Sequence, residues 1–460
     1  MTAAYNEYLD AGGAARPAVA AFRRRTGVDA TRPAARAARG LSDAPLGDRI
    51  PISPLPLVLS EHEYREVLEP GVRQRARALQ LFFGDMVLGP QAVLAPGGPL
   101  PRETLEWVFD DEGLGLAELR RLWSGKSLRE ARFVYGPDLI RAPEGDWRVT
   151  EDNIGRIGGM ADTFSILRRF QDETGATAAV ESGDDLARAV TLYLAEFGLS
   201  PRDSGVVALL SYDDSSDALE LGDLENTRRL AVLEGLGIET WDLNRLDEAR
   251  RRRALDGAVK AFVNFDVRAW TPRKELRETV FRERGVPLFE SPGVKVVDNK
   301  GFLPFVEEFV RFYLKEEPIL RTQPTELVRE PVLPDPALWV VKKADGLESR
   351  QVLLLPRMRP SQLRAAGKTL EGWLAQRRET DGRPPVVVRQ RYVSPSYLPL
   401  SPEPASWAGL LVELRPITYV YGDGKIYVGR HLNGRAISSL GDPRNCITRG
   451  AFGLPVFLEP

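Results

Sequence analysis

Three oxygen-bearing side chains stand at hairpin spacing in the first third of the chain. Asp138 is followed thirteen residues later by Glu151, and Asn153 lies two residues further on. A turn at 144–146 would bring Asp138 back beside Glu151. Glu151 and Asn153 face the same side of an extended strand because they are two residues apart. Three oxygen ligands of this kind leave coordination positions for water and phosphate oxygens, as Mg²⁺ usually requires.

A glycine-rich segment follows these three residues directly. Gly155, Gly158 and Gly159 lie within residues 154–160, beside Arg156. Backbone amides in such a loop, together with an arginine, can hold an anionic group. The alternative interpretation is a charged hairpin with a solvated turn, because most Asp and Glu side chains are exposed.

The composition restricts which chemistry is available. The 460 residues include 63 Lys and Arg, 65 Asp and Glu, two His and one Cys, Cys446. The near-zero charge balance does not indicate a nucleic-acid binder. One cysteine and two histidines exclude an internal disulfide, a multi-thiolate zinc or iron–sulfur site and a poly-His metal site. Carboxylates, lysines, arginines, amides and hydroxyls remain, and they suit a hard cation and phosphates.

Neither a secretory signal nor a membrane span is expected. The first residues lack a basic segment followed by an apolar core, and no run of 18 or more apolar residues occurs. The expected location is the reducing cytoplasm.

The elements that must position these side chains are expected from local patterns. A long helix is predicted at 64–88, interrupted near Pro70-Gly71, and the strands of the hairpin are predicted at 132–135 and 147–151. Between 185 and 298, alternating strands and a helix predict a small α/β unit with a parallel sheet. Its predicted elements are strand 205–211, helix 220–236, and strands 238–243, 258–263 and 286–289.

The last third is expected to begin with a stiff linker at 317–336, which holds five prolines. Strands are predicted at 338–342, 351–355 and 386–390, with a helix at 361–377. Residues 410–428 are predicted to form a hairpin that turns at Gly422-Asp423-Gly424.

The order of Asp138, Glu151, Asn153 and a glycine loop resembles the magnesium hairpin of the ATP-grasp ligases, a superfamily that includes D-alanine–D-alanine ligase and glutathione synthetase. In the usual members this hairpin lies near the C-terminus. Its early position here is similar to the circularly permuted ATP-grasp proteins. Further segments that resemble this family are 5–17, 70–85, 298–304 and 314–318.

The resemblance implies an α/β fold class (α+β ATP-grasp, circularly permuted) with a Rossmann-like pre-ATP-grasp α/β domain. The implied domains are an N-terminal region with the magnesium-binding subdomain (1–184), the pre-ATP-grasp domain (185–298), the nucleotide-binding subdomain (299–395) and a return to the magnesium and acceptor subdomain (396–460).

The resemblance also implies the cofactors ATP and Mg²⁺ and their ligands. Asp138, Glu151 and Asn153 match the metal ligands, and Lys300 and Lys342 match the two ATP lysines. The residues that match the adenine-holding hinge are Gln390, Arg391, Tyr392 and Val393. Ser349 and Arg350 lie in the segment expected to cover the γ-phosphate. That segment departs from the family, because it has one glycine and carries Asp345 and Glu348.

Catalytic roles are implied for three arginines. Arg415 and Arg435 resemble arginines that stabilise an oxyanion or hold an acyl phosphate. Arg156 is the third, because Gly155 stands where the family has an arginine. Asn445 is a weaker candidate for the neighbourhood of the metal or the phosphates.

The implied function is an ATP-dependent carboxylate–amine ligase that forms an amide through an acyl phosphate and releases ADP and phosphate. Its partners would be small-molecule or peptide carboxylates and amines, and neither nucleic acid nor a membrane is expected. A homodimer is possible. The alternative is a catalytically weakened ATP-grasp protein that acts as a nucleotide sensor or assembly partner. A third possibility, a pure α/β scaffold protein, does not account well for Asp138, Glu151 and Asn153.

Overall fold

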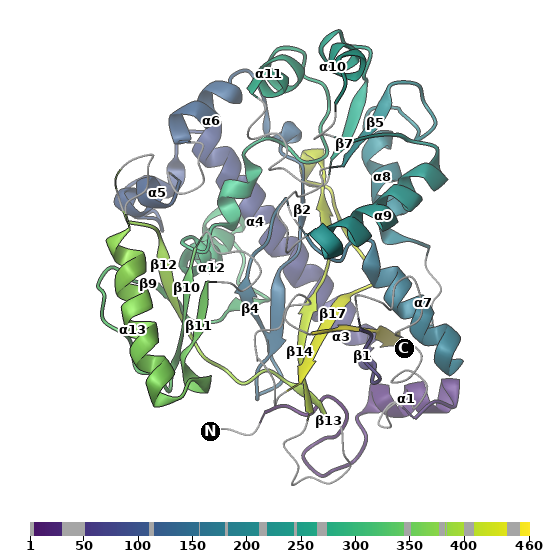
Figure 1. Cartoon of the computed structure of the whole chain (residues 1–460), viewed down its shortest axis with the longest axis vertical. Helices are drawn as coiled ribbons and strands as arrows, with labels where there is room; N and C mark the ends of the chain where they lie inside the picture. Colours follow the sequence, from purple (N-terminus) through teal and green to yellow (C-terminus); the bar gives the residue numbers. More distant parts are fainter. Residues whose placement is uncertain are drawn as a thin grey trace.

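The computed structural model describes residues 4–29, 51–109, 115–155, 157–179, 183–210, 219–242, 246–264, 274–344, 351–376, 382, 384–399, 409–438 and 451–460. Within them, helices pack around several separate β-sheets (Figure 1). The α-helices are α1 (Pro17–Thr26), α3 (Glu61–Glu63), α4 (Glu69–Val87), α5 (Arg102–Phe109), α6 (Leu116–Leu122), α7 (Asp162–Thr174), α8 (Asp185–Ala195), α9 (Leu219–Leu236), α10 (Glu248–Leu255), α11 (Lys274–Leu276), α12 (Val306–Phe309) and α13 (Pro360–Ala375).

The largest sheet joins strands from both ends of the chain. Its order is β18-β17-β14-β3-β4-β8, and β13 also pairs with β14. These strands are β3 (Asp138–Arg141), β4 (Trp147–Glu151), β8 (Arg321–Thr322), β13 (Tyr397–Pro399), β14 (Gly409–Arg415), β17 (Asn433–Ser438) and β18 (Phe452–Leu454). The early hairpin β3–β4 therefore lies beside the late strands β14 and β17 (Figure 1).

A second, antiparallel sheet has the order β11-β10-β12-β9. Its strands are β9 (Thr325–Leu327), β10 (Trp339–Lys343), β11 (Val352–Leu354) and β12 (Val387–Arg391). Helix α13 covers one face of this sheet (Figure 1), and Ala366 and Leu370 pack there with Val341 and Val387. The apolar side chains of these strands and this helix form a hydrophobic cluster that is separate from the main core.

The middle segment forms a parallel sheet of order β6-β5-β7. Its strands are β5 (Val206–Leu210), β6 (Glu239–Asp242) and β7 (Ala261–Asn264), and α9 follows β5 along the chain. The predicted parallel α/β unit is confirmed. The predicted strand at 286–289 is wrong, because in the described residues this segment makes only an isolated bridge between Phe262 and Leu288. The Rossmann-like character of the unit stays a prediction.

Helix α4 runs through the middle of the molecule (Figure 1). It is preceded by α3 and a π-helical turn, Tyr64–Leu68, so the predicted helix continues past Pro70. The chain stays helical through Pro70, which follows the π-helical turn after one residue. Gly71 permits close packing, since a Cβ there would come 2.5 Å from Cγ of Leu320.

Three other expectations are corrected by the pairing of strands. Segment 132–135 is not the partner of β4: β2 (Phe133–Tyr135) pairs with β15 (Thr418–Val420), which pairs with β16 (Ile426–Val428). The predicted hairpin at 410–428 is divided at Pro416, because β14 and β15 belong to different sheets. The predicted linker at 317–336 contains the short strands β8 and β9.

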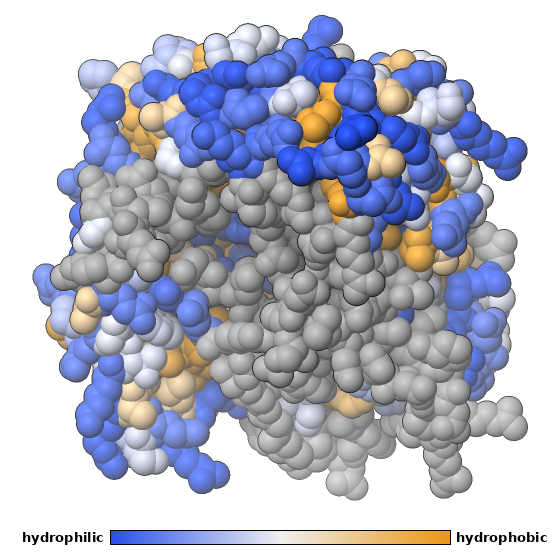
Figure 2. Space-filling view, turned by 45° about the horizontal axis from the view of Figure 1, so that its top comes forward, coloured by the Kyte–Doolittle hydropathy of each residue, from blue (hydrophilic) through white to orange (hydrophobic). Residues whose placement is uncertain are grey.

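The last strand pairs with the first one along the chain. Strand β1 (Leu57–Ser60) pairs in parallel with β19 (Val456–Glu459). Hydrophilic side chains gather over the end of the molecule that carries α10 and α11 (Figure 2). None of the helices in the described ranges is long and apolar enough to cross a membrane.

Candidate functional site

The predicted metal ligands meet across the β3–β4 hairpin. Asp138 and Glu151 are facing residues of the antiparallel pair, and the register shifts directly after Asp138. The next pair is Leu139 with Val149, so Thr150 is the extra residue of a bulge. Bulges commonly re-aim side chains beside functional sites. Here the bulge lets the carbonyl of Thr150 accept hydrogen bonds from outside the hairpin.

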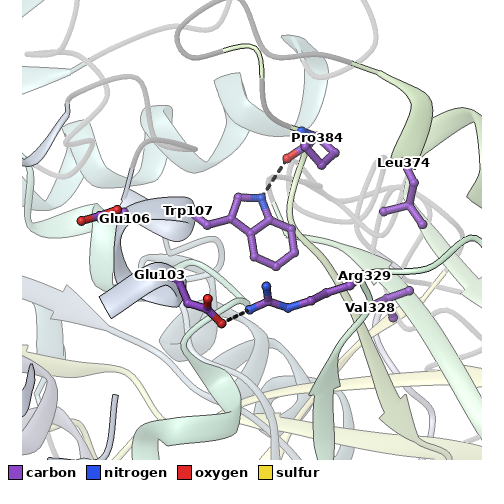
Figure 3. Close-up of a pocket in the computed structure, with 7 residues that line it drawn as sticks. All are labelled: Glu103, Glu106, Trp107, Val328, Arg329, Leu374 and Pro384. Atoms are coloured by element: carbon purple, nitrogen blue, oxygen red, sulfur yellow. Dashed lines mark hydrogen bonds and ion pairs between the residues drawn. The ribbon is translucent and has the colours of Figure 1, made fainter. Parts of the chain in front are cut away.

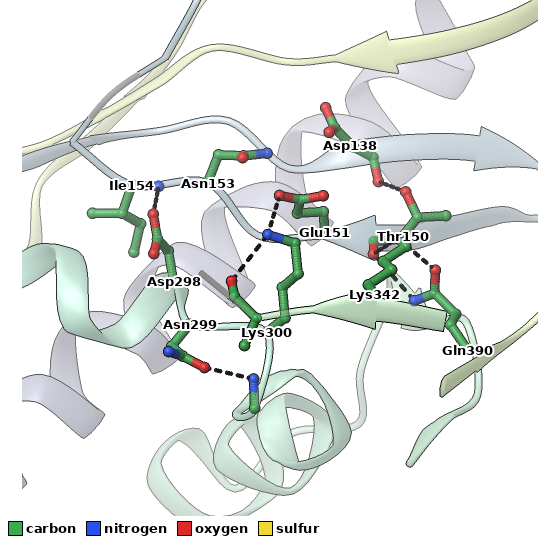
Figure 4. A network of polar contacts seen from close by, with 12 residues as sticks. Asp138, Thr150, Glu151, Asn153, Ile154, Asp298, Asn299, Lys300, Lys342 and Gln390 are labelled. Carbon is green, nitrogen blue, oxygen red and sulfur yellow. Dashed lines mark hydrogen bonds and ion pairs between the residues drawn. The ribbon is translucent and has the colours of Figure 1, made fainter. Parts of the chain in front are cut away.

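Both predicted nucleotide lysines reach this hairpin from other segments (Figure 4). Nζ of Lys300 lies 2.9 Å from Oε1 of Glu151 and donates to the carbonyl of Ala344 at 3.2 Å. Nζ of Lys342 donates to the carbonyl of Thr150 at 3.1 Å and to Oε1 of Gln390 at 2.9 Å. Burial lowers the pKa of Lys342. The structure thus places two buried cations beside the predicted ligands.

Two arginines hold the carboxylate of Asp138. Nε and Nη2 of Arg415 donate to its two oxygens at 2.7 and 2.9 Å, and Nη2 of Arg435 donates to Oδ1 at 2.6 Å. Burial alone would raise the pKa of Asp138, but Arg415 and Arg435 outweigh it and hold this pKa at about 2. Two of the three predicted catalytic arginines, Arg415 and Arg435, therefore lie at the predicted metal site.

Glu413 is a further carboxylate at this site, and the sequence analysis missed it. It faces Arg435 across β14 and β17 and pairs with its guanidinium. Burial raises the pKa of Glu413 to about 7, against the opposing effect of Arg435. We call the following residues the central charge cluster: Asp138, Glu151, Glu413, Lys300, Lys342, Arg415 and Arg435.

Asn153 and the glycine loop form one border of the central charge cluster. Nδ2 of Asn153 donates to the carbonyl of Gly136 at 3.0 Å, which directs its amide oxygen away from that carbonyl. Nδ2 of Asn433 donates to the carbonyl of Gly158 at 3.0 Å. Gly159 has φ +89°, and a Cβ there would come 2.1 Å from Nδ2 of Asn433. Only glycine allows this approach between the loop and β17.

Asp298 is a second residue whose role the sequence analysis missed. Its Oδ2 accepts the backbone N–H of Ile154 at 3.1 Å (Figure 4). Its Oδ1 lies 3.1 Å from Nζ of Lys295. Burial raises the pKa of Asp298. It ties the start of the glycine loop to the segment that carries Lys300.

The four predicted hinge residues lie at the end of β12. The side chain of Gln390 is buried and accepts a hydrogen bond from Lys342, so it lies against the central charge cluster. The carbonyl of Arg391 accepts from Nε2 of Gln323 at 2.6 Å, and the N–H of Tyr392 donates to the carbonyl of Leu338 at 2.7 Å. Val393 follows in an irregular segment. Adenine binding by this hinge stays a prediction.

Some predicted residues lie outside the described residues. These are Arg156, Ser349, Arg350 and Asn445. Their roles remain predictions.

A pocket of about 320 Å³ lies away from the central charge cluster, between α5, the end of β9 and α13 (Figure 3). Nε1 of Trp107 donates to the carbonyl of Pro384 at 2.9 Å, and Arg329 pairs with Glu103 at 3.3 Å. Its lining residues are Glu103, Glu106, Trp107, Val328, Arg329, Leu374 and Pro384. None of the predicted site residues is among them.

The donor set of the central charge cluster fits a hard cation with a polyphosphate. Two facing carboxylates and an amide supply oxygen atoms, which Mg²⁺ prefers over nitrogen or sulfur. Four cationic side chains meet three carboxylates, so the cluster carries an excess of positive charge when all are ionised. Lysines bound to carboxylate and carbonyl oxygens can exchange these acceptors for phosphate oxygens.

Comparison with known proteins gives relatives of low identity. The chain is 28% identical over 333 residues to an uncharacterized protein of Synechocystis, covering 68% of this chain and 66% of that protein. It is 27% identical over 414 residues to a Frankia alni protein with the provisional name glutamate--cysteine ligase 2-3, covering 81% of this chain and 46% of that protein. The chain thus spans about half the length of that Frankia relative and under two thirds of the Synechocystis one.

A solved structure has a similar fold. The glutathione synthetase-like effector GSS30 of Globodera pallida, in its apoform, superposes with a TM-score of 0.50 at 16% identity, covering 89% of this chain and 90% of that one. Residues 56–219 and 263–418 match the family described as circularly permuted ATP-grasp type 2. Because this match covers more than half of the sequence, the chain belongs to the circularly permuted ATP-grasp type 2 family.

Proposed function

We propose that the protein is an ATP-dependent carboxylate–amine ligase that forms an amide through an acyl phosphate. The observation that carries this proposal is the central charge cluster. Facing carboxylates Asp138 and Glu151 lie against two buried lysines and two arginines from distant segments. Phosphoryl transfer needs charge neutralisation and in-line positioning more than a strong base, and such a cluster supplies both.

Asp138, Glu151 and Asn153 would hold Mg²⁺. In the described part of the chain, no group of three or more His, Cys, Asp or Glu side chains is arranged as a metal site. The metal would therefore complete its coordination with oxygens of the nucleotide and water, as Mg²⁺ commonly does. When bound, it neutralises charge on the phosphates that react.

The lysines and arginines would divide the remaining charge between them. Lys300 and Lys342 bind the phosphates of ATP while an oxygen of the acid substrate attacks the γ-phosphorus and the bond to ADP breaks. The lone pair of the amine then attacks the acyl carbon, phosphate leaves with the C–O bond electrons, and the amine proton passes to solvent or phosphate. Arg415 and Arg435 stabilise the oxyanion between these events. Arg156, Ser349 and Arg350 would add contacts to the phosphates.

The relatives support an acid and an amine of amino-acid or peptide type. A glutamate–cysteine ligase, which is the provisional name of the Frankia relative, joins a carboxylate to an amine. The matched part is less than half of that protein, so the substrate pair is a proposal for this chain.

The test is a screen for ADP release with pairs of amino acids and small peptides, followed by mass analysis of the product. Glu151→Gln removes a carboxylate of the central charge cluster and is expected to abolish the substrate-dependent release. Glu326→Gln is the matched control, because Glu326 is also a strand glutamate in an ion pair, with Arg389 on an exposed face. The proposal fails if Glu151→Gln and Glu326→Gln release ADP at the same rate. Binding of Mg·ATP without turnover by any acid would instead support the nucleotide-sensor alternative.

A further inference from the structure

A buried ion pair lies behind the predicted metal ligands. Arg75 of α4 donates from Nε to Oδ1 of Asp152 at 2.6 Å and from Nη2 to Oδ2 at 2.8 Å. The hydroxyl of Tyr135 donates to Oδ1 of Asp152 at 2.6 Å. Nη1 of Arg75 donates to Oγ1 of Thr322 at 2.9 Å. Arg75 is 2% exposed and Asp152 5%, so solvent does not screen this network.

Asp152 stands between two of the residues that would bind the metal. The side chains of Glu151 and Asn153 face Lys300 and Gly136, whereas that of Asp152 is bonded to α4 and β2. Three donors fix the carboxylate of Asp152, and its backbone is continuous with both neighbours. A rotation of this segment would turn Glu151 and Asn153 out of the cluster.

Attachment of α4 to the rest of the protein does not depend on Arg75 alone. Phe82 stacks on Phe309 with ring centroids 4.2 Å apart, and the hydroxyl of Tyr313 donates to Asp85 at 2.8 Å. A buried ion pair often adds little net stability compared with apolar side chains of similar volume. Its directional hydrogen bonds instead favour one conformation of the segment that they hold.

We propose that Arg75 and Asp152 are positioning residues that orient Glu151 and Asn153 for the metal–nucleotide complex. This inference rests on the proposed function, because it assigns those two residues to the metal. Arg75 belongs to segment 70–85, one of the segments that resemble the family, and this segment thereby gains a role. Residues that orient metal ligands typically change metal affinity by about 10- to 100-fold when replaced.

The experiment measures binding of Mn²⁺ with a non-hydrolysable ATP analogue by calorimetry, and separately the Mg²⁺ concentration for half-maximal ADP release. Asp152→Asn keeps the shape of the side chain but removes its charge. We expect the dissociation constant for the Mn²⁺–analogue complex to rise by about tenfold or more. The KM for the acid substrate should change much less, since Asp152 lies on the far side of the strand from the cluster.

The matched control is Glu7→Gln. Glu7 is another buried carboxylate bonded to an arginine, Arg141, at 3.0 Å, but Arg141 lies at the opposite end of the β3–β4 hairpin. Glu7→Gln should lower the thermal midpoint without changing the dissociation constant of the complex. An equal effect of Asp152→Asn and Glu7→Gln on that constant would overturn the inference, because it would reflect a general loss of stability.

Tyr135→Phe keeps the inference testable if Asp152→Asn does not fold. It removes one of three donors and leaves the ion pair with Arg75, so we expect a rise in the dissociation constant of up to about tenfold. An unchanged constant in Tyr135→Phe and, where it folds, Asp152→Asn would overturn the positioning role and leave the proposed function standing. Failure of the wild-type protein to bind the complex would overturn both.

Discussion

Arginine and carboxylate side chains meet in two contrasting regions of this protein. In the central charge cluster, Arg415 and Arg435 hold Asp138 below the surface. On α10, Arg253 pairs with Glu239 at 2.9 Å, with both side chains 43% exposed. Water screens the exposed pair, whereas the buried groups are removed from solvent and interact more strongly. The same residue types therefore form the proposed reaction site in one region and a solvated surface in the other.

The largest effect is expected from breaking a buried pair. Arg415→Met removes the bidentate partner of Asp138, whose pKa near 2 keeps it charged at neutral pH. We expect the free energy of unfolding to fall by about 3–5 kcal/mol, because a buried charge loses its main partner. Urea unfolding followed by tryptophan fluorescence measures this change. A loss below about 1 kcal/mol would mean that the cluster behaves like the exposed pair on α10.

A change of pH is expected to alter the free energy of unfolding less than Arg415→Met does. Burial raises the folded-state pKa of Glu413 from 4.5 to about 7, so its stabilising contribution is complete below about pH 4.5 and is lost as the pH rises through 7. The lowered pKa of Asp138 acts in the opposite direction, but only between about pH 4 and 2. Unfolding without metal or nucleotide should therefore show a loss of stability between pH 5 and 8 that is smaller in Glu413→Gln. The same slope in both proteins would contradict the assignment to Glu413.

The smallest change in the free energy of unfolding is expected from a substitution on α10. Arg253→Met removes the exposed pair with Glu239 and should change the free energy of unfolding by less than about 1 kcal/mol. ADP release should be unchanged. A loss as large as that of Arg415→Met would remove the contrast between the two regions.

Local sequence patterns were sufficient for elements that bury their own apolar face. Strands β10 and β12 and helix α13 form a core from apolar runs that are close in sequence. The partner of β4 was predicted incorrectly because pairing depends on distant segments. Strand β2 pairs with β15, which is distant in sequence. Strand β3 was not predicted, because it is short and has charged residues, Asp138 and Arg141, at its two ends.

The site was predictable where a motif keeps its residues at fixed spacing. Asp138, Glu151 and Asn153 lie on one hairpin, and the family resemblance added the two lysines and two arginines that the structure brings to it. Glu413 and the pair of Arg75 with Asp152 were missed, because each partner lies on another strand or helix. A single glutamate inside the otherwise apolar run 409–414 was the available signal for Glu413.

Two neighbouring lysines on β10 allow the most direct test of the nucleotide site. Lys342 is buried in the central charge cluster, and Lys343 follows it on the opposite face of the strand. Calorimetry with Mg²⁺ and a non-hydrolysable ATP analogue should show binding by the wild-type protein, weakened at least about tenfold in Lys342→Met, because a charged hydrogen bond to phosphate is lost. Lys343→Met should bind as the wild type does. Equal affinity of Lys342→Met and Lys343→Met, or no binding by the wild-type protein, would contradict the assignment of this cluster to ATP.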